Sequence, residues 1–183
     1  MIERVSTRLD GPILLQPTVH GDDRGFFVET FRSDAYRAAG IDAAFVQDNH
    51  SRSARGTLRG LHFQRHPGQP KLIRVARGSI WDVIVDIRPA SDTFGTFEAF
   101  ELDDMEHRQL YVPIGFAHGF CVTSEVADVT YKVGSPYDAE EERGIAWDDP
   151  ELAIPWPIRE PILSERDRHN PTMRDAVALL RPG

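Results

Sequence analysis

The stretch SIWDVIVDI, residues 79–87, has the pattern of a β-strand that is occupied on both of its faces. Successive side chains of a strand point to opposite faces of its sheet, so one face of this segment carries only large apolar residues. The other face alternates isoleucine with Asp82 and Asp86. A sandwich or a barrel covers both faces of such a strand. The two aspartates are either solvated or border a polar space, and this strand alone leaves both interpretations open.

Short segments of the same kind lie on both sides of this strand. They alternate apolar with polar residues or form short apolar runs, and turn sequences rich in Gly, Pro and Asp separate them. These predicted strands span residues 25–31, 44–51, 57–64, 71–78, 96–102, 108–113, 118–123 and 127–133. Many short strands at this spacing favour an all-β barrel or sandwich over alternating strands and helices.

Two short helices are predicted beside the strands. Residues 33–39 form the first, with Ser33 as its N-cap and Gly40 just past its end. The second lies near the C-terminus, where Asn170 and Pro171 form an N-cap and first-turn pair before the segment MRDAVALL.

Length and charge limit the classes of protein to which the chain can belong. With 183 residues, 40% of them hydrophobic and 27% charged, it is expected to form one globular domain over residues 1–183. A net charge of −8 argues against general nucleic-acid binding but leaves room for a small anion held by local arginines. The single Cys121 forms no intrachain disulfide, and no apolar signal region or membrane-length run is present. We therefore expect a cytoplasmic protein that does not contact a membrane.

Polar and ionisable residues lie inside several predicted strands, where burial without partners is costly. The segment TLRGLHFQ, residues 57–64, contains Arg59 and His62. One such residue alone is commonly a hydrogen-bonded packing residue or lies at a wet strand edge. Together, polar groups on successive strands indicate a polar cavity inside a β-barrel, where small ligands bind. The other members of this set are Gln47, Asn49, Lys71, His118 and Tyr131.

Sequence motifs give no support to several kinds of catalytic site. The H-x-H pair of metal-binding barrels is missing, because a Phe-Gln pair follows His62. Cys121 lacks the sequence context of a nucleophile, and the motifs of a serine-nucleophile elbow and of glycine-rich phosphate loops are absent. A bound phosphate would therefore need side chains such as Arg24 and Arg59.

Acid–base chemistry is the remaining option. Imidazole groups commonly serve as bases near neutral pH, so His62 is a candidate base, oriented by a carboxylate from Asp82 or from the acidic stretch 163–167. Tyr131 is a candidate acid, and Lys71 is a candidate stabiliser of a developing oxyanion. This set suits the removal of a proton beside a carbonyl group.

Longer motifs run along nearly the whole chain. The most specific are RGLHFQ (59–64) and GFAHGF (115–120). The others are GDDRGFFVETF (21–31), VQDNHSRSARGTL (46–58), KLIRVARGSIWDVIVDIR (71–88), YKVGSPYDAEEERGIAWDDPELAIPWP (131–157) and PILSERD (161–167). In this order they resemble the dTDP-4-dehydrorhamnose 3,5-epimerases, cupin-fold enzymes of nucleotide-sugar biosynthesis. The resemblance implies a cupin-type jelly-roll barrel with the two short flanking helices.

The resemblance also implies roles for the candidate acid–base residues. His62, the histidine of the RGxHxQ motif, would remove a proton beside the C4 ketone, and Asp167 of the LSExD motif would pair with it. Lys71 would stabilise the enolate, and Tyr131 would return a proton from the opposite face. The implied reaction uses no metal and no other cofactor.

Substrate contacts and assembly follow from the same resemblance. The substrate would be a dTDP-linked keto-deoxy sugar, with its thymine ring stacked on Tyr137 and its diphosphate held by arginines. Family members are homodimers whose N-terminal strands cross to the partner, so Arg24 and Glu29 are expected to serve the partner's site. The residues carried over as substrate-binding are Arg24, Glu29, Gln47, Asp48, Asn49, Arg59, His118, Tyr137, Glu142 and Arg166.

Three other interpretations stand beside this one. A mono-epimerase that inverts only C3 or only C5 of a related nucleotide-linked keto sugar would share these motifs. A non-catalytic sugar-nucleotide-binding cupin would have no need of His62, Tyr131, Lys71 and Asp167, and a metal-dependent cupin enzyme is opposed by the missing H-x-H pair. The sequence leaves open whether one or two carbons are inverted, which nucleotide is preferred and which pathway follows. It also leaves open whether Asp82 shares the orienting role.

Overall fold

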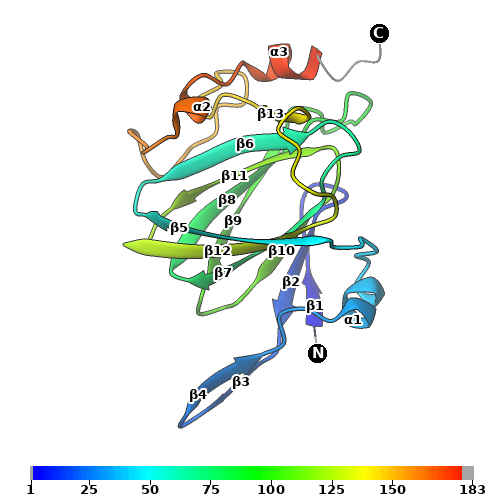
Figure 1. Ribbon diagram of the computed structural model, residues 1–183, viewed down its shortest axis with the longest axis vertical. Helices are drawn as coiled ribbons and strands as arrows, with labels where there is room; N and C mark the ends of the chain where they lie inside the picture. The colour runs from blue at the N-terminus through cyan, green and yellow to red at the C-terminus, as the bar shows by residue number, and fades with distance from the viewer. Residues whose placement is uncertain (1, 179–183) are drawn as a thin grey trace.

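Two antiparallel sheets packed face to face form the body of the protein. A computed structural model describes residues 2–178, and Figure 1 shows the smaller sheet above the larger one. The larger sheet has six strands in the order β1 (Ile2–Val5), β2 (Ile13–Pro17), β10 (Gln109–Val112), β7 (Lys71–Arg77), β12 (Val126–Val133) and β5 (Gln47–Ala54). The smaller sheet has five strands in the order β13 (Glu142–Gly144), β6 (Leu58–Gln64), β11 (Phe116–Val122), β8 (Ser79–Asp86) and β9 (Phe97–Asp103).

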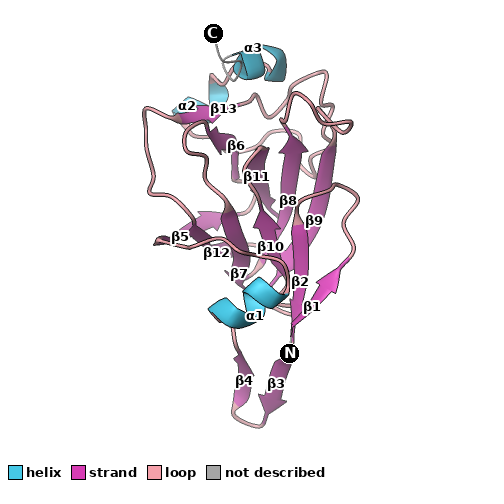
Figure 2. Cartoon of the chain, turned by 90° about the vertical axis from the view of Figure 1, so that its right-hand side faces the viewer, coloured by secondary structure: helices cyan, strands magenta, loops and turns pink. Residues whose placement is uncertain are grey.

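The remaining elements lie around these two sheets. A hairpin of β3 (Val19–Asp22) and β4 (Gly25–Val28) extends away from the sheets, as Figures 1 and 2 show. The helices are α1 (Ser33–Ala38), beside the larger sheet, and α2 (Glu165–Arg168) and α3 (Met173–Ala178), beside the smaller one. Within the described residues, none of these helices is long and apolar enough to cross a membrane.

The all-β architecture predicted from sequence is confirmed, and every predicted strand is present with shifted ends. The prediction omits β1, β2, β3, β13 and α2. The strand β13 has three residues, too few for a periodic pattern, and β3 extends into one of the Gly- and Asp-rich stretches that were interpreted as turns. Short strands of this kind owe their conformation to pairing with a neighbour, which composition does not reveal.

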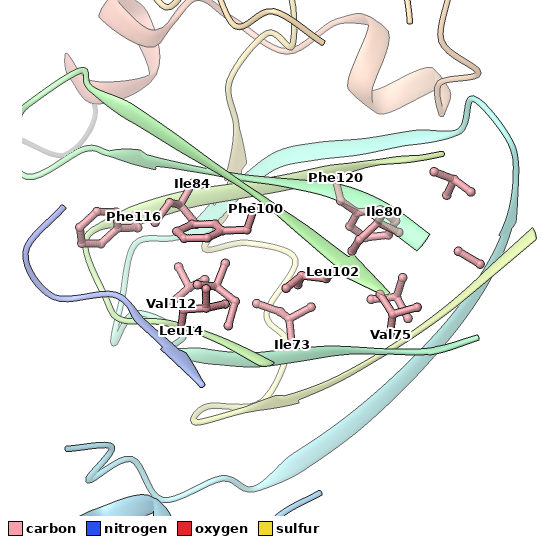
Figure 3. Packing of buried hydrophobic residues seen from close by; sticks show 14 of the residues in the cluster. Leu14, Ile73, Val75, Ile80, Ile84, Phe100, Leu102, Val112, Phe116 and Phe120 are labelled. Carbon is pink, nitrogen blue, oxygen red and sulfur yellow. The ribbon is translucent and has the colours of Figure 1, made fainter. Parts of the chain in front are cut away.

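Both faces of β8 are buried, as the segment SIWDVIVDI predicts. Ile80 and Ile84 point into the main core between the sheets, where they pack with Phe120 and other apolar side chains (Figure 3). This core joins the two sheets, because it takes residues from both of them. Face-to-face packing of two apolar sheet faces is the main stabilising contact of a two-sheet barrel.

The opposite face of β8 forms a second core under the C-terminal part of the chain. Val83 and Val85 pack there with Met173 of α3. The rings of Trp81 and Trp156 meet edge to face, with their centroids 5.3 Å apart. The chain after β13 is therefore held against the smaller sheet, and this places α2 beside β6.

Asp82 and Asp86 are both 0% exposed, so the interpretation of these residues as solvated is wrong. Asp86 accepts hydrogen bonds from Arg88 Nη2 (2.7 Å), Ser91 Oγ (2.6 Å) and Thr93 Oγ1 (2.6 Å). Burial alone would raise the pKa of Asp86, but these hydrogen bonds hold it well below its usual range. Both aspartates of β8 are therefore buried, and Asp86 is stabilised there by the donors that surround it.

The helix termini differ from the predicted ones. Arg32 rather than Ser33 is the N-cap of α1, and no side chain caps this end. Helix α3 begins at Met173, and the Thr172 hydroxyl accepts a hydrogen bond from Asp175 N (3.3 Å), so Asn170 and Pro171 precede the cap instead of forming it. Gly40 does follow the first helix, at φ +96°. The last two residues of the predicted C-terminal helix, 179–180, lie outside the described residues.

The buried acceptor Asp86 predicts a pH-dependent contribution to stability. Asp86→Ala leaves three donors without their acceptor and should lower the free energy of unfolding at pH 7 by about 3 kcal/mol. Because the folded-state pKa of Asp86 is lowered, this contribution is present above the ordinary carboxyl pKa and is lost as the pH falls below it. Urea unfolding between pH 7 and pH 3 measures the difference.

The exposed pair of Asp22 with Arg24 supplies the matched control. Asp22→Ala should change the free energy of unfolding much less than Asp86→Ala does at pH 7, because solvent screens this exposed pair. An Asp86→Ala variant as stable as the Asp22→Ala variant at pH 7 would contradict this role.

Candidate active site

A cavity of about 640 Å³ opens between the two sheets, beside the main core. Its wall comes from β5, β6, β7, β11, β12 and β13 and from the chain around α2. Small-molecule sites commonly have volumes of about 300–1,000 Å³. The predicted polar cavity therefore exists, and its size suits a small ligand.

His62 of β6 and Asp167 of α2 form a hydrogen-bonded pair in this cavity. His62 Nε2 lies 2.6 Å from Asp167 Oδ1, and Asp167 is only 3% exposed. Burial alone would raise the pKa of Asp167, but hydrogen bonds from His62 and Ser164 and the His62 charge lower it overall. An ionised Asp167 accepts the Nε2 proton, which leaves His62 Nδ1 as the nitrogen that can take up another proton.

Helix α2 explains how Asp167 reaches this position. Ser164 is the N-cap, and its hydroxyl accepts a hydrogen bond from Asp167 N (3.1 Å). The cap starts the short helix at a fixed point, so that the third helical residue faces β6. Asn170 Nδ2 adds a longer contact to Asp167 Oδ1 (3.4 Å).

A second His–Asp pair lies beside the first. His118 of β11 is the direct cross-strand partner of His62. Its Nε2 lies 2.9 Å from one oxygen of Asp82 and 3.1 Å from the other. Asp82 therefore orients His118, whereas Asp167 orients His62, and the question of which carboxylate contacts His62 is resolved in favour of Asp167.

Two further ionisable side chains, Lys71 and Tyr131, line the cavity. Burial lowers the pKa of Lys71, and the charges of Glu142 and Asp82 oppose that shift. Burial raises the pKa of Tyr131, the Glu142 charge raises it further, and Arg59 opposes the rise. The phenol therefore keeps its proton at neutral pH.

Most of the predicted binding residues line the same cavity. Gln47 accepts a hydrogen bond from Tyr137 N (3.1 Å) and donates one to Asn49 Oδ1 (2.9 Å). Arg166 forms an ion pair with Glu142. The predicted residues along the cavity wall are Gln47, Asn49, Arg59, His62, Lys71, His118, Tyr131, Tyr137, Glu142, Arg166 and Asp167.

Three predicted residues lie outside the cavity of their own chain. Asp48 points to the opposite face of β5 from its neighbours and pairs with Lys132 (2.8 Å), as strand alternation requires. Arg24 lies at the turn of the β3–β4 hairpin, and Glu29 follows that hairpin and pairs with Arg32.

Sequence reasoning did not find several other wall residues. Ser51 lies on the same face of β5 as Gln47 and Asn49, so alternation could have identified it. The chain before α2 has no periodic pattern that would indicate its place. The wall residues that were not predicted are Ser51, Thr57, Leu58, Gln69, Phe120, Ile162, Leu163 and Ser164.

Gly60 explains why β6 and β11 approach so closely beside the histidines. A Cβ at Gly60 would lie 2.5 Å from Gly119 Cα and 2.7 Å from His118 O, and Gly60 has φ +121°. The register of the two strands shifts between His118 and Phe120 at this point. Only glycine fits this backbone conformation and this approach.

Comparisons with known proteins agree with this geometry. The sequence model of the dTDP-4-dehydrorhamnose 3,5-epimerase family matches residues 6–175. A dTDP-4-dehydrorhamnose 3,5-epimerase of Pseudomonas aeruginosa is 50% identical over 175 residues, which cover 93% of this chain and 97% of that protein. A dTDP-4-dehydrorhamnose 3-epimerase of Streptomyces niveus is 40% identical over 162 residues, which cover 87% of this chain and 78% of that protein.

The fold is also that of a solved epimerase. The crystal structure of a dTDP-6-deoxy-D-glucose-3,5-epimerase from Legionella pneumophila, in complex with dTDP-4-keto-L-rhamnose, superposes with a TM-score of 0.95. Its sequence is 42% identical, and the match covers 100% of this chain and 98% of that one. The predicted cupin-type jelly roll with short flanking helices is thereby confirmed.

The contact at Gly60 predicts a large effect on folding. Gly60→Ala should lower the free energy of unfolding by more than about 3 kcal/mol or prevent folding, because the new methyl group meets backbone atoms. Gly25→Ala is the matched control, since Gly25 has φ +128° but open space around its Cβ direction. That variant should lose only about 1 kcal/mol from backbone strain. Equal losses in urea unfolding would contradict the proposed close contact.

Proposed function

The chain belongs to the dTDP-4-dehydrorhamnose 3,5-epimerase family, and on this basis we propose a mechanism in which His62 and Tyr131 act on opposite faces of a sugar ring. The protein is an isomerase of a dTDP-linked 4-keto-6-deoxyhexose, and it inverts C3, C5 or both, beside the C4 ketone. The hydrogen bond between His62 and Asp167 inside the cavity is the observation that carries the proposed mechanism.

His62 is the proposed base. Its Nδ1 takes the proton from C3 or C5, and the electron pair of the broken C–H bond moves into the ring so that an enolate forms with its charge on the C4 oxygen. Asp167 holds the reactive tautomer and stabilises the imidazolium that results. This buried carboxylate is a positioning residue, because it acts through His62.

Lys71 and His118 are proposed to stabilise the enolate oxygen. A proton beside a ketone is only weakly acidic, so the developing oxyanion needs positive or hydrogen-bonding partners placed in advance. Lys71 supplies an ammonium group in the cavity wall. Asp82 fixes the ring of His118 through its Nε2, and this support makes His118 a candidate partner for the ketone.

Tyr131 is the proposed acid. Because its pKa is raised, the phenol is protonated and can donate to the carbon from the face opposite His62. Removal of a proton on one face and delivery on the other inverts the carbon. Solvent then returns a proton to the phenolate and accepts the proton from His62, which restores the starting state.

We further propose that the chain works as a homodimer with exchanged N-terminal strands. Phe26 and Phe27 of the β3–β4 hairpin are 61% and 69% exposed, and a monomer rarely presents such a pair at the end of an arm. The hairpin extends away from its own barrel (Figure 1), and β5 is a free edge of the larger sheet. In the dimer, Arg24 and Glu29 would enter the partner's cavity.

The remaining expectations stay part of this proposal. Residues 1–183 form one domain, and the enzyme works in the cytoplasm without a metal or other cofactor. Packing of α3 against β8 supports the first point, since it ties the C-terminal part of the described chain to the barrel. Assays in the presence of a strong chelator test the last point, because loss of turnover there would overturn cofactor-free catalysis.

The His62–Asp167 pair predicts the effect of a single change. Asp167→Asn keeps the size of the side chain but removes its charge, and should lower turnover about ten- to a thousandfold. The free energy of unfolding should change much less than turnover. Unchanged turnover in a folded Asp167→Asn variant would remove Asp167 from the mechanism.

The two faces of the reaction can be separated in heavy water. Tyr131→Phe should still exchange substrate protons for deuterium through His62, but its yield of inverted product should fall. His62→Ala should lose both exchange and inversion, because no base remains. NMR of recovered substrate and product measures both quantities. If Tyr131→Phe inverts its substrate at the wild-type rate, another group delivers the proton.

Mixed dimers test strand exchange. Arg24→Ala chains should be weakly active alone, and His62→Ala chains should be inactive. In an exchanged dimer each cavity takes His62 from its own chain and Arg24 from the partner chain. A mixed dimer therefore contains one cavity with both changes and one with neither. Denaturing and refolding an equal mixture should therefore restore about a quarter of wild-type turnover, since about half the dimers are mixed and half of their cavities are intact. No restoration would contradict the exchange.

A further inference from the structure

One buried hydroxyl group in the cavity wall has no partner. Ser51 Oγ is shielded from solvent and makes no hydrogen bond within residues 2–178. The other such side-chain atoms in this part of the chain are Arg65 Nε and Thr130 Oγ1, and neither residue lines this cavity. A buried hydroxyl without a partner is costly, so a group that fills the cavity is expected to satisfy it.

Ser51 shares the cavity wall with an arginine that has no charged partner within the described residues. Arg59 Nε donates to Ser53 Oγ (3.0 Å), and within the described residues Arg59 forms no ion pair with a carboxylate. The other arginine of the cavity wall, Arg166, is paired with Glu142. The guanidinium of Arg59 is therefore available to an incoming anion. The hydrogen bond from its Nε to Ser53 holds the group in place.

Asn49 supplies a third donor on the same strand face. Its Oδ1 accepts from Gln47 Nε2 (2.9 Å), and within residues 2–178 its Nδ2 group donates no hydrogen bond, so this group is available to a ligand. Asn49, Ser51 and Ser53 follow one another at every second position of β5, about 7 Å apart. Amide, hydroxyl and guanidinium donors along one wall match a group with several acceptor oxygens.

We propose that Ser51 is a further substrate-binding residue whose hydroxyl donates to an oxygen of the nucleotide diphosphate, and that Ser53 positions Arg59 for the same group. This inference rests on the proposed function, which supplies a nucleoside diphosphate as part of the substrate. Arg59, His62 and Lys71 all line this cavity, and the diphosphate is the anionic part of that substrate, so Arg59, which has no carboxylate partner within the described residues, is matched to it by charge.

Binding of dTDP and of thymidine tests the role of Ser51. Ser51→Ala should weaken dTDP binding, measured by calorimetry, about ten- to a hundredfold, because a hydrogen bond to a charged group is lost. Thymidine affinity should not change. In turnover assays KM should rise while kcat stays within about threefold of wild type.

Thr130→Val is the matched control. Thr130 also has a buried hydroxyl without a partner, but it points to the other face of β12 and lines a different hollow. Both variants should keep the wild-type melting temperature without ligand, since neither removes a hydrogen bond. Only Ser51→Ala should show a smaller rise in melting temperature on addition of dTDP.

Ser53 is tested through its dependence on Arg59. Ser53→Ala should weaken dTDP binding in the wild-type background, Ser53→Thr should restore it, and Ser53→Ala should have no further effect in an Arg59→Ala protein. Additive losses would show that Ser53 does not act through Arg59 and would overturn its positioning role.

The outcomes separate this inference from the function itself. Wild-type protein that binds no dTDP would contradict the proposed function. Wild-type binding with an unaffected Ser51→Ala variant would overturn only the role of Ser51. Equal losses of dTDP and thymidine affinity, or a higher KM with unchanged dTDP affinity, would also overturn the diphosphate assignment, since Ser51 would then contact the nucleoside or the sugar.

Discussion

The close contact between Gly60 and Gly119 is the constraint on which the cavity depends. It brings β6 against β11 where the register shifts, and this arrangement sets His62 directly opposite His118. Two imidazoles side by side in a largely buried wall each need an acceptor of their own. Asp167 comes from the capped helix α2 and Asp82 from the neighbouring strand β8, so each pair ties a different part of the chain to this point.

The charges of the cavity are arranged for an anionic, enolisable ligand although the chain carries a net charge of −8. Asp167 and Asp82 are already paired with histidines, whereas half-buried Lys71 forms no ion pair within residues 2–178 and Arg59 donates to a serine hydroxyl. Positive groups that are not tied up in ion pairs favour a bound anion and, later, a developing enolate. Overall charge therefore says little about a site whose local field is set by a few oriented side chains.

Most of the barrel and most of the cavity wall could be predicted from sequence. Strand alternation in SIWDVIVDI correctly indicated two covered faces, and the family motifs led to His62, Lys71, Tyr131 and Asp167 in one cavity. The partner of Asp82 could not be predicted, because it depends on the strand order that places β8 next to β11. Ser33 and Asn170 have good N-cap chemistry, but neighbouring backbone geometry starts each helix elsewhere.

The central claim is that this cavity interconverts sugar epimers through an enolate formed beside the C4 ketone. Incubation of the wild-type protein with dTDP-4-keto-6-deoxyglucose in heavy water, followed by NMR of the product, tests it most directly. The account predicts deuterium at every carbon that is inverted, at C3 and C5 for double inversion and at one of them for a mono-epimerase. Inverted product without deuterium at the inverted carbon, or bound substrate that neither exchanges nor inverts, would contradict it.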